Sequence, residues 1–96
     1  MAIQEQYQED IAILTAESPT YSIVLWNDDV NTFDWVIQAL VEICHMNETQ
    51  AEQCSLLVHF KGKCVVAEGS YDDLKPKCSA ITDRGIQATV EQLARQ

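Results

Sequence analysis

The ten residues from Trp26 to Trp35 hold the densest group of side chains that could bind a ligand. Six of the ten are Asn, Asp or Thr, whose short polar side chains bond to nearby backbone and therefore favour turns and helix caps. A turn alone does not require an asparagine followed by two aspartates, Asn27, Asp28 and Asp29, in a chain that is already acidic. Amide and carboxylate oxygens accept hydrogen bonds, and carboxylates also attract positive charge. We therefore predict that this loop is a binding site.

The charge balance indicates which ligands suit such a site. The 96 residues include 15 Asp and Glu against 6 Lys and Arg, which gives a formal net charge of −9. An acidic chain repels phosphate backbones, so we expect no nucleic acid partner and a ligand that is basic or carries a local positive charge. Residues 1–20 contain acidic but no basic side chains and are interpreted as a flexible extension. Residues 21–96 are then expected to form one small globular domain.

The four cysteines are spaced ten, ten and fourteen residues apart. No C-x-x-C pair occurs, and the spacing matches neither a zinc site nor a thioredoxin-type redox site, so we expect no cofactor and no metal. The N-terminal residues lack the features of a signal peptide, and no stretch approaches the roughly 20 apolar residues that span a membrane. These features predict a cytoplasmic protein with no membrane partner and with reduced thiols. The cysteines are Cys44, Cys54, Cys64 and Cys78.

The predicted binding loop lies between a strand and a helix. From Tyr21 to Trp26, β-branched and aromatic residues alternate between two faces, which predicts a strand with both faces at least partly covered. From Phe33 to Cys44, apolar residues recur at helical spacing. Either Asn31 or Thr32 can cap this helix. The loop is therefore held at both ends by regular structure.

A second helix is predicted between Asn47 and Gly62. Asn47 followed by Gln50 resembles a capping box, and Gly62 can adopt the left-handed conformation that ends a helix. His59 then lies in the last turn of this helix. Its inner face is expected to hold Ala51, Cys54, Leu57 and Val58.

The remaining residues predict a strand over 64–67, a helix over 71–84 and a strand over 86–91. An interior proline disrupts a helix, so Pro76 indicates either a helix that begins near Lys75 or a kinked one. The element order is β-α-α-β-α-β. It predicts an α+β fold, a two-layer sandwich in which a three-stranded antiparallel or mixed sheet carries three helices on one face.

Two stretches within this order resemble the ClpS family. Asn27-Asp28-Asp29 follows the first predicted strand, and Val58-His59-Phe60-Lys61-Gly62 ends the second predicted helix, with apolar residues in register between them. The similarity extends from residue 21 to about residue 91. Members of this family are adaptors that bring substrates with a destabilising N-terminal residue to the ATP-dependent Clp protease. The resemblance implies a monomeric, non-enzymatic adaptor whose partners are such substrates and the N-terminal domain of a ClpA-like Clp ATPase.

The resemblance also implies that Asn27, Asp29 and His59 bind the α-amino group of the substrate. A primary ammonium group offers three N–H donors and a positive charge. An amide oxygen, a carboxylate and one ring nitrogen of a neutral histidine are suitable acceptors. An acetylated N-terminus would leave an acceptor unpaired in a partly buried site, at a cost of roughly 1–3 kcal/mol per group. Asp28 is interpreted as a structural residue of the loop.

The resemblance also implies a pocket for the first side chain of the substrate. Several residues expected to line this pocket differ from those usual in the family. Phe33 and Ser55 stand where the family has methionines, with Ser55 expected on the rim. Asn31 replaces a threonine, and Thr32 replaces a proline. An aromatic or leucine N-terminal residue is expected from the family, while the two exchanged methionines leave the accepted residues open. The apolar lining that is retained consists of Val36, Val58 and Ile86.

Docking to the protease is implied for Asp72 and Lys77. They match an acidic and a basic residue near the start of the family's third helix, although Asp72 is one methylene shorter than the family's glutamate. Pro76 adjoins Lys77, and the segment from Lys77 to Ile86 is shorter than usual for the family. These departures leave docking through this surface open.

Two other kinds of function compete with the adaptor hypothesis. An enzyme needs a nucleophile with a base and an orienting acid, or two carboxylates across a cleft. Asp28 and Asp29 are adjacent and point apart on an extended loop, whereas Ser55 and His59 share a helix face without an orienting acid. No catalytic residue is therefore predicted. The other alternative is a ClpS-like interaction module, with a fold also found in ribosomal stalk proteins, that has lost recognition of N-terminal residues.

Overall fold

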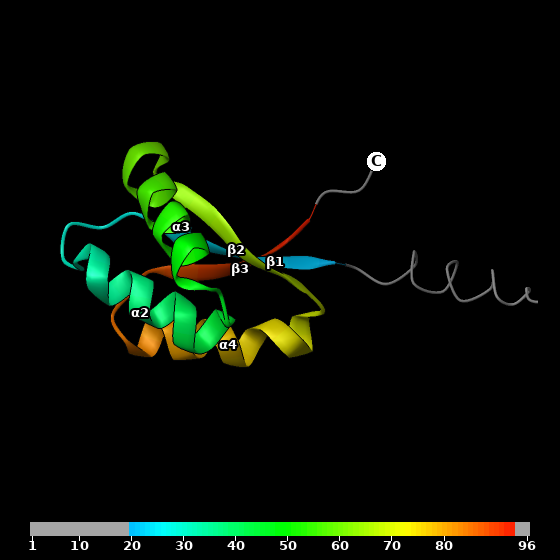
Figure 1. Ribbon diagram of the computed structural model, residues 1–96. Helices are drawn as coiled ribbons and strands as arrows, with labels where there is room; N and C mark the ends of the chain where they lie inside the picture. Colours follow the sequence, from blue (N-terminus) through cyan, green and yellow to red (C-terminus); the bar gives the residue numbers. More distant parts are fainter. Residues whose placement is uncertain (1–19, 94–96) are drawn as a thin grey trace, which may run out of the picture.

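A computed structural model of the protein describes residues 20–93, which form three strands and three helices (Figure 1). Their order confirms the predicted β-α-α-β-α-β arrangement. The predicted acidic extension lies outside the described residues, apart from Thr20. Within residues 20–93, no helix is long and apolar enough to cross a membrane. The elements are β1 (Tyr21–Trp26), α2 (Phe33–Cys44), α3 (Glu48–Lys61), β2 (Lys63–Gly69), α4 (Tyr71–Asp83) and β3 (Ala88–Gln92).

The sheet has the order β2-β1-β3, and both pairs of strands are antiparallel. The sequence was compatible with an antiparallel or a mixed sheet, and the structure shows that the sheet is antiparallel. Between β1 and β2 the register shifts, because Ile23 pairs with Ala67 whereas Val24 pairs with Val65. Val66 is thus the extra residue of a bulge, and it is buried in the core while Val65 is exposed.

The two outer strands differ slightly in extent from their predicted ranges. The ladder extends β2 to both ends of β1, with Trp26 opposite Lys63 and Tyr21 opposite Gly69, although lysine and glycine have low strand propensity. β3 begins at Ala88, two residues later than predicted. Ile86 therefore precedes the strand, but it is buried all the same.

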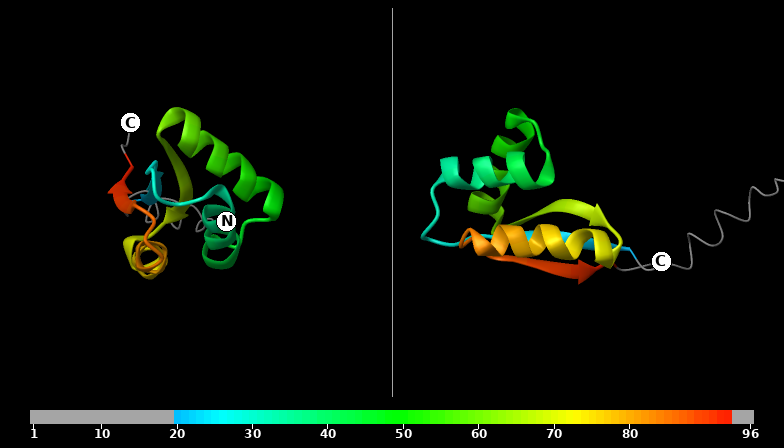
Figure 2. Two further views of the ribbon diagram at one scale, coloured as in Figure 1. Left: turned by 90° about the vertical axis from the view of Figure 1, so that its left-hand side faces the viewer. Right: turned by 90° about the horizontal axis from the view of Figure 1, so that it is seen from below.

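All three helices cover one face of the sheet, as predicted (Figures 1 and 2). α3 packs against β2 and α2, while α4 packs along β3 and β1. On the opposite face of β1, Ser22 and Val24 are also buried, which confirms that both faces of this strand are covered. The largest fully buried side chains of the core are Ile23, Leu25, Leu40, Leu74 and Ile81.

The ends of α2 and α3 are fixed by the local signals that the sequence predicts. Thr32 rather than Asn31 caps α2, and α3 begins with a complete capping box between Asn47 and Gln50. α3 ends at Gly62, whose φ of 93° is left-handed. Thr32 and Gly62 thus set the two helix ends that border the binding loop.

Of the two alternatives left open for the third helix, a start near Lys75 is wrong, and the helix covers nearly the whole predicted range of 71–84. α4 begins at Tyr71, where the Ser70 hydroxyl accepts a hydrogen bond from the Asp73 N–H at 3.2 Å. Pro76 is the sixth residue of the helix and removes one backbone hydrogen bond. Its position is exposed, so water can bind the carbonyl group that loses its partner.

The predicted inner face of α3 is partly wrong. Leu57 is 45% exposed, and the buried residues are Ala51, Ser55 and Val58. Their spacing of i, i+4 and i+7 describes one stripe along a helix, which Leu57 does not share. Ser55, which was not expected on the inner face, is therefore buried, while Leu57 is exposed.

Candidate functional site

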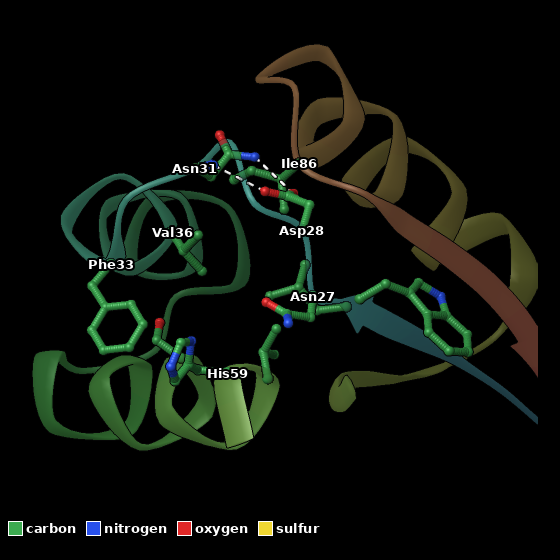
Figure 3. Close-up of a pocket in the computed structure, with 11 residues that line it drawn as sticks. Asn27, Asp28, Asn31, Phe33, Val36, His59 and Ile86 are labelled. Atoms are coloured by element: carbon green, nitrogen blue, oxygen red, sulfur yellow. Dashed lines mark hydrogen bonds between the residues drawn. The ribbon is translucent and has the colours of Figure 1, made fainter. Parts of the chain in front are cut away.

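A hollow opens where the end of β1 and the start of α2 meet the last turns of α3 (Figure 3). It encloses about 390 Å³ with its open mouth included, of which about 50 Å³ is room for the centres of water molecules. One water molecule needs roughly 10–15 Å³ of such space, so the hollow holds about four water molecules. About four water molecules occupy a volume similar to that of one large side chain. The lining residues are Leu25, Trp26, Asn27, Asp28, Asn31, Phe33, Val36, Ser55, Val58, His59 and Ile86.

Eight of the nine residues predicted for the α-amino and side-chain sites line this hollow. The exception is Asp29, which is exposed in the loop and is not a lining residue. Its neighbour Asp28, which was expected to be a structural residue of the loop, lines the hollow instead. The structure thus brings together residues from β1, α2, α3 and the segment before β3.

Asp28 holds the loop in shape. Its Oδ1 accepts hydrogen bonds from the backbone N–H groups of Val30 and Asn31, both at 2.9 Å, and its Oδ2 accepts one from the Asn31 side chain at 2.8 Å. Burial alone would raise the pKa of Asp28, but the hydrogen bonds from Asn31 and Val30 outweigh it, so the pKa is lowered. Asp28 therefore remains charged at neutral pH and keeps a negative charge in the wall of the hollow.

This lowered pKa predicts a pH dependence of stability. A carboxyl group whose pKa is lower in the folded state stabilises the fold above its ordinary pKa of 3.8, and this contribution disappears as pH falls through the folded-state value. We expect Asp28→Asn to lower the melting temperature at pH 6, with a difference from the unmodified protein that shrinks below about pH 3.8. Thermal unfolding followed by circular dichroism between pH 2 and 6 measures this. A difference that is constant over this range would contradict it.

Asn31 and Trp35 join the loop and the start of α2 to the turn between α4 and β3. The Asn31 side-chain N–H donates to the Gly85 carbonyl at 2.9 Å, and the Trp35 indole N–H donates to the Arg84 carbonyl at 3.0 Å. Arg84 also lies over the Trp35 ring and forms an ion pair with Glu42 on α2. Asn31 thus lines the hollow and also holds the loop against the turn between α4 and β3.

Asn27 and His59 face the hollow near its mouth, and both are exposed (Figure 3). The backbone N–H of Asn27 donates to the Gly62 carbonyl at 2.9 Å. This bond fixes the start of the loop against the end of α3, whose last turn carries His59. The two residues come from positions far apart in the chain, and this contact between their elements holds them beside the same opening.

An aromatic group forms one side of the mouth. The rings of Phe33 and His59 meet edge to face with centroids 5.4 Å apart, and Phe60 meets His59 from another side at 4.9 Å. Phe33 is 43% exposed, so it lies at the opening rather than in the core, where the helical stripe placed it. Phe33 thus limits the space at the mouth and restricts the orientation of the His59 ring. The sequence offered no signal for the contact with Phe60.

Ser55 lies deeper than the rim position at which it was expected. It is 2% exposed, and its hydroxyl is buried with no hydrogen-bond partner. Val58 beside it is also buried, and Ile86 is buried from the other side of the fold. The expectation of a serine rim is wrong because the spacing of the buried stripe turns this position toward the core. The part of the wall formed by Ser55, Val58 and Ile86 is therefore apolar apart from one unpaired hydroxyl, while Asp28 and Asn31 line the hollow from the loop.

The two residues predicted for docking lie on α4, outside the hollow. Asp72 is in the first turn and Lys77 follows Pro76, five residues further along. At about 100° per residue, this spacing places them roughly 140° apart around the helix. The structure does not bring them together as one ion pair.

The side chains of the hollow offer hydrogen-bond acceptors and an apolar patch. The described residues include no group of three or more His, Cys, Asp or Glu side chains that could hold a metal ion. Ser55 and His59 both line the hollow, but the serine hydroxyl does not donate a hydrogen bond to the imidazole, as an activated nucleophile would. The hollow combines acceptors at the mouth with an apolar patch formed by Val36, Val58 and Ile86.

Comparison with known proteins agrees with this arrangement. The family model for the ATP-dependent Clp protease adaptor protein ClpS matches residues 16–93. The ClpS adapter protein of Acetivibrio thermocellus is 36% identical over 61 residues, which cover 64% of this chain and 62% of that protein. The ClpS adapter protein of Myxococcus xanthus is 28% identical over 85 residues, which cover 80% of this chain and 79% of that protein.

The fold has a counterpart among solved structures. The structure of Agrobacterium tumefaciens ClpS2 bound to L-phenylalaninamide matches with a TM-score of 0.77 at 24% identity, and the match covers 80% of this chain and all of that one. At this level of identity the likeness establishes the fold, whereas the family model, which spans most of the chain, establishes the lineage. The chain belongs to the ClpS family of adaptors of the ATP-dependent Clp protease.

Proposed function

We propose that this protein binds the free N-terminal residue of substrate proteins in the hollow and delivers those substrates to an ATP-dependent Clp protease without catalysing a reaction itself. The observation that supports this most directly is the distribution of polarity in the hollow. Two exposed acceptors, Asn27 and His59, stand at the mouth, while apolar side chains form one part of the interior. A peptide N-terminus has the same distribution, with a charged amine beside a side chain that can be buried.

The α-amino group is held by the acceptors at the mouth. The Asn27 amide oxygen and one nitrogen of a neutral His59 each accept one N–H, and Asp29 binds the third directly or through a water molecule from its exposed place in the loop. Asp28 is already engaged by three donors, so it contributes its charge rather than a free oxygen. Two adjacent carboxylates thus make the mouth favourable for an ammonium ion.

The first side chain enters the apolar part of the hollow. Val36, Val58 and Ile86 offer it an apolar wall. The ClpS2 relative is bound to L-phenylalaninamide, a compound with a free amine beside an aromatic side chain. We therefore assign aromatic or leucine N-terminal residues to this protein.

Delivery uses a different surface from recognition. Asp72 and Lys77 are placed on the first half of α4, and the other end of this helix borders the binding loop through Arg84 and Gly85. A helix of 13 residues is about 20 Å long, so a ClpA-like ATPase domain can contact α4 while the hollow is occupied. The docking surface and the hollow are thus separate enough to act together.

Acetylation of the peptide is expected to abolish binding. A peptide with a free N-terminal Phe, Tyr, Trp or Leu should bind at micromolar strength, while its acetylated form has no charge and only one N–H to donate. The loss of charge-assisted hydrogen bonds, each about 1.5–3 kcal/mol, predicts affinity at least about tenfold lower. Fluorescence anisotropy with labelled peptides measures both forms. Equal binding of the two forms, or no binding of either, would instead favour an interaction module without N-terminal recognition.

A further inference from the structure

The unpaired hydroxyl of Ser55 is the least explained group in the hollow. It lines the cavity, lies on a residue that is 2% exposed, and has no hydrogen-bond partner. A buried serine in a helix can bond to the carbonyl group four residues earlier, here that of Ala51, but this bond is absent. A buried polar group without a partner destabilises the fold, and such a group in a binding site is satisfied when a ligand supplies the partner.

The position of Ser55 limits which ligand atom can reach it. His59, at the mouth, is four residues further along α3, which corresponds to a rise of about 6 Å. A ligand held by its α-amino group at His59 must therefore carry its second polar atom several ångströms into the hollow. The hydroxyl groups of serine and threonine lie too close to the α-carbon for this, whereas the phenol oxygen of tyrosine lies at the far end of an apolar ring.

The surroundings of Ser55 suit the same ligand. The neighbouring side chains of Val36, Val58 and Ile86 are apolar and would pack against a ring rather than against a polar chain. The hydroxyl of Ser55 can both donate and accept, so it can pair with a phenol in either direction. Phenylalanine would fill the same space but leave this hydroxyl unpaired.

Building on the proposed function, we propose that Ser55 is a specificity-determining residue that makes N-terminal tyrosine the preferred ligand over N-terminal phenylalanine. The two side chains differ by one hydroxyl group, so their comparison isolates this hydrogen bond. A buried hydrogen bond that replaces an unpaired group predicts affinity for the tyrosine peptide that is roughly five- to tenfold higher.

Peptides that differ only in an N-terminal Tyr or Phe test this by fluorescence anisotropy against three proteins. In the unmodified protein we expect the tyrosine peptide to bind more tightly. Ser55→Ala should abolish or reverse the preference for the tyrosine peptide, because it removes the hydroxyl and leaves the buried phenol unpaired. Ser79→Ala, at an exposed serine on α4, is the matched control and should keep the preference.

The outcomes separate this inference from the proposed function. If both peptides bind equally to the unmodified protein, or if the tyrosine preference survives Ser55→Ala, the role of Ser55 is refuted while recognition of free N-termini stands. If neither peptide binds, or if acetylated forms bind equally well, the proposed function fails, and the role of Ser55 fails with it. Circular dichroism of Ser55→Ala should show a melting temperature at least as high as that of the unmodified protein, since no buried bond is lost.

Discussion

His59→Ala is expected to lower the affinity for free N-terminal peptides roughly ten- to hundredfold. The substitution removes one acceptor of the α-amino group, and a hydrogen bond to a charged group contributes about 1.5–3 kcal/mol. It also removes the ring that Phe33 contacts edge to face at 5.4 Å, so the side of the mouth loses its packing. Isothermal titration calorimetry with a peptide that begins with an aromatic residue measures the change.

The fold itself should tolerate this substitution. His59 is exposed, and substitutions at exposed positions usually change the free energy of unfolding by less than about 0.5 kcal/mol. His59→Gln should restore part of the affinity, because a glutamine amide supplies an acceptor that alanine lacks. Lys61→Ala, in the same turn of α3, is the surface control and should bind like the unmodified protein. Unchanged affinity in His59→Ala would remove this residue from the site.

The parts of the site that depend on neighbouring residues were predictable from the sequence. Thr32 was one of two predicted caps of α2, and the box formed by Asn47 and Gln50 and the stop at Gly62 form as predicted, because each acts within a single helical turn. These ends fix where α2 and α3 begin and finish. The element order and the two-layer fold follow from them and from the strand alternation.

The features of the site that depend on contacts between residues far apart in the chain were not predictable from local sequence patterns. Asn31 and Gly85 are 54 residues apart in sequence, and Trp35 and Arg84 are 49 apart, so no local pattern signals their hydrogen bonds. Hydropathy assigned Leu57 to the interior of α3, but the direction in which a helix faces is set by its packing partners. The rim position of Ser55 was implied by the resemblance to the family, and the structure instead buries this residue.

Pro76 shows how packing can override a local rule. The proline predicted either a kink or a late start for the third helix, yet α4 extends through it from Tyr71. Leu74 before it and Ile81 after it are 2% and 0% exposed. Both belong to the core cluster, and burying two large side chains contributes about 1.5–3 kcal/mol each, enough to offset the roughly 3 kcal/mol that an interior proline costs. The free energy gained by burying Leu74 and Ile81 depends on what the helix packs against, and the local sequence pattern does not contain this information.

Leu40→Ala is expected to have the largest effect on stability and to remove binding as a consequence. Leu40 is fully buried on α2, the helix that carries the Phe33 and Val36 walls of the hollow. Leucine-to-alanine substitutions at such positions cost about 2–5 kcal/mol, because the lost transfer free energy adds to that of the cavity left behind. At about 0.05–0.15 kcal/mol per residue, the whole domain has roughly 4–11 kcal/mol, so this loss is a large fraction of its stability.

The expected fall in the melting temperature of Leu40→Ala is about 8–40 °C, since the loss of about 2–5 kcal/mol shifts a domain of this size by roughly 4–8 °C per kcal/mol. Leu57→Ala is the matched control, because it deletes the same atoms from a leucine that is 45% exposed, and it should cost less than about 1 kcal/mol. Urea unfolding of both variants gives the two free energies. Similar losses in both would mean that α2 does not anchor the wall of the hollow through Leu40. A large loss in Leu40→Ala alone, with peptide binding that disappears as the variant unfolds, would show that the hollow depends on the packing of α2 onto the sheet.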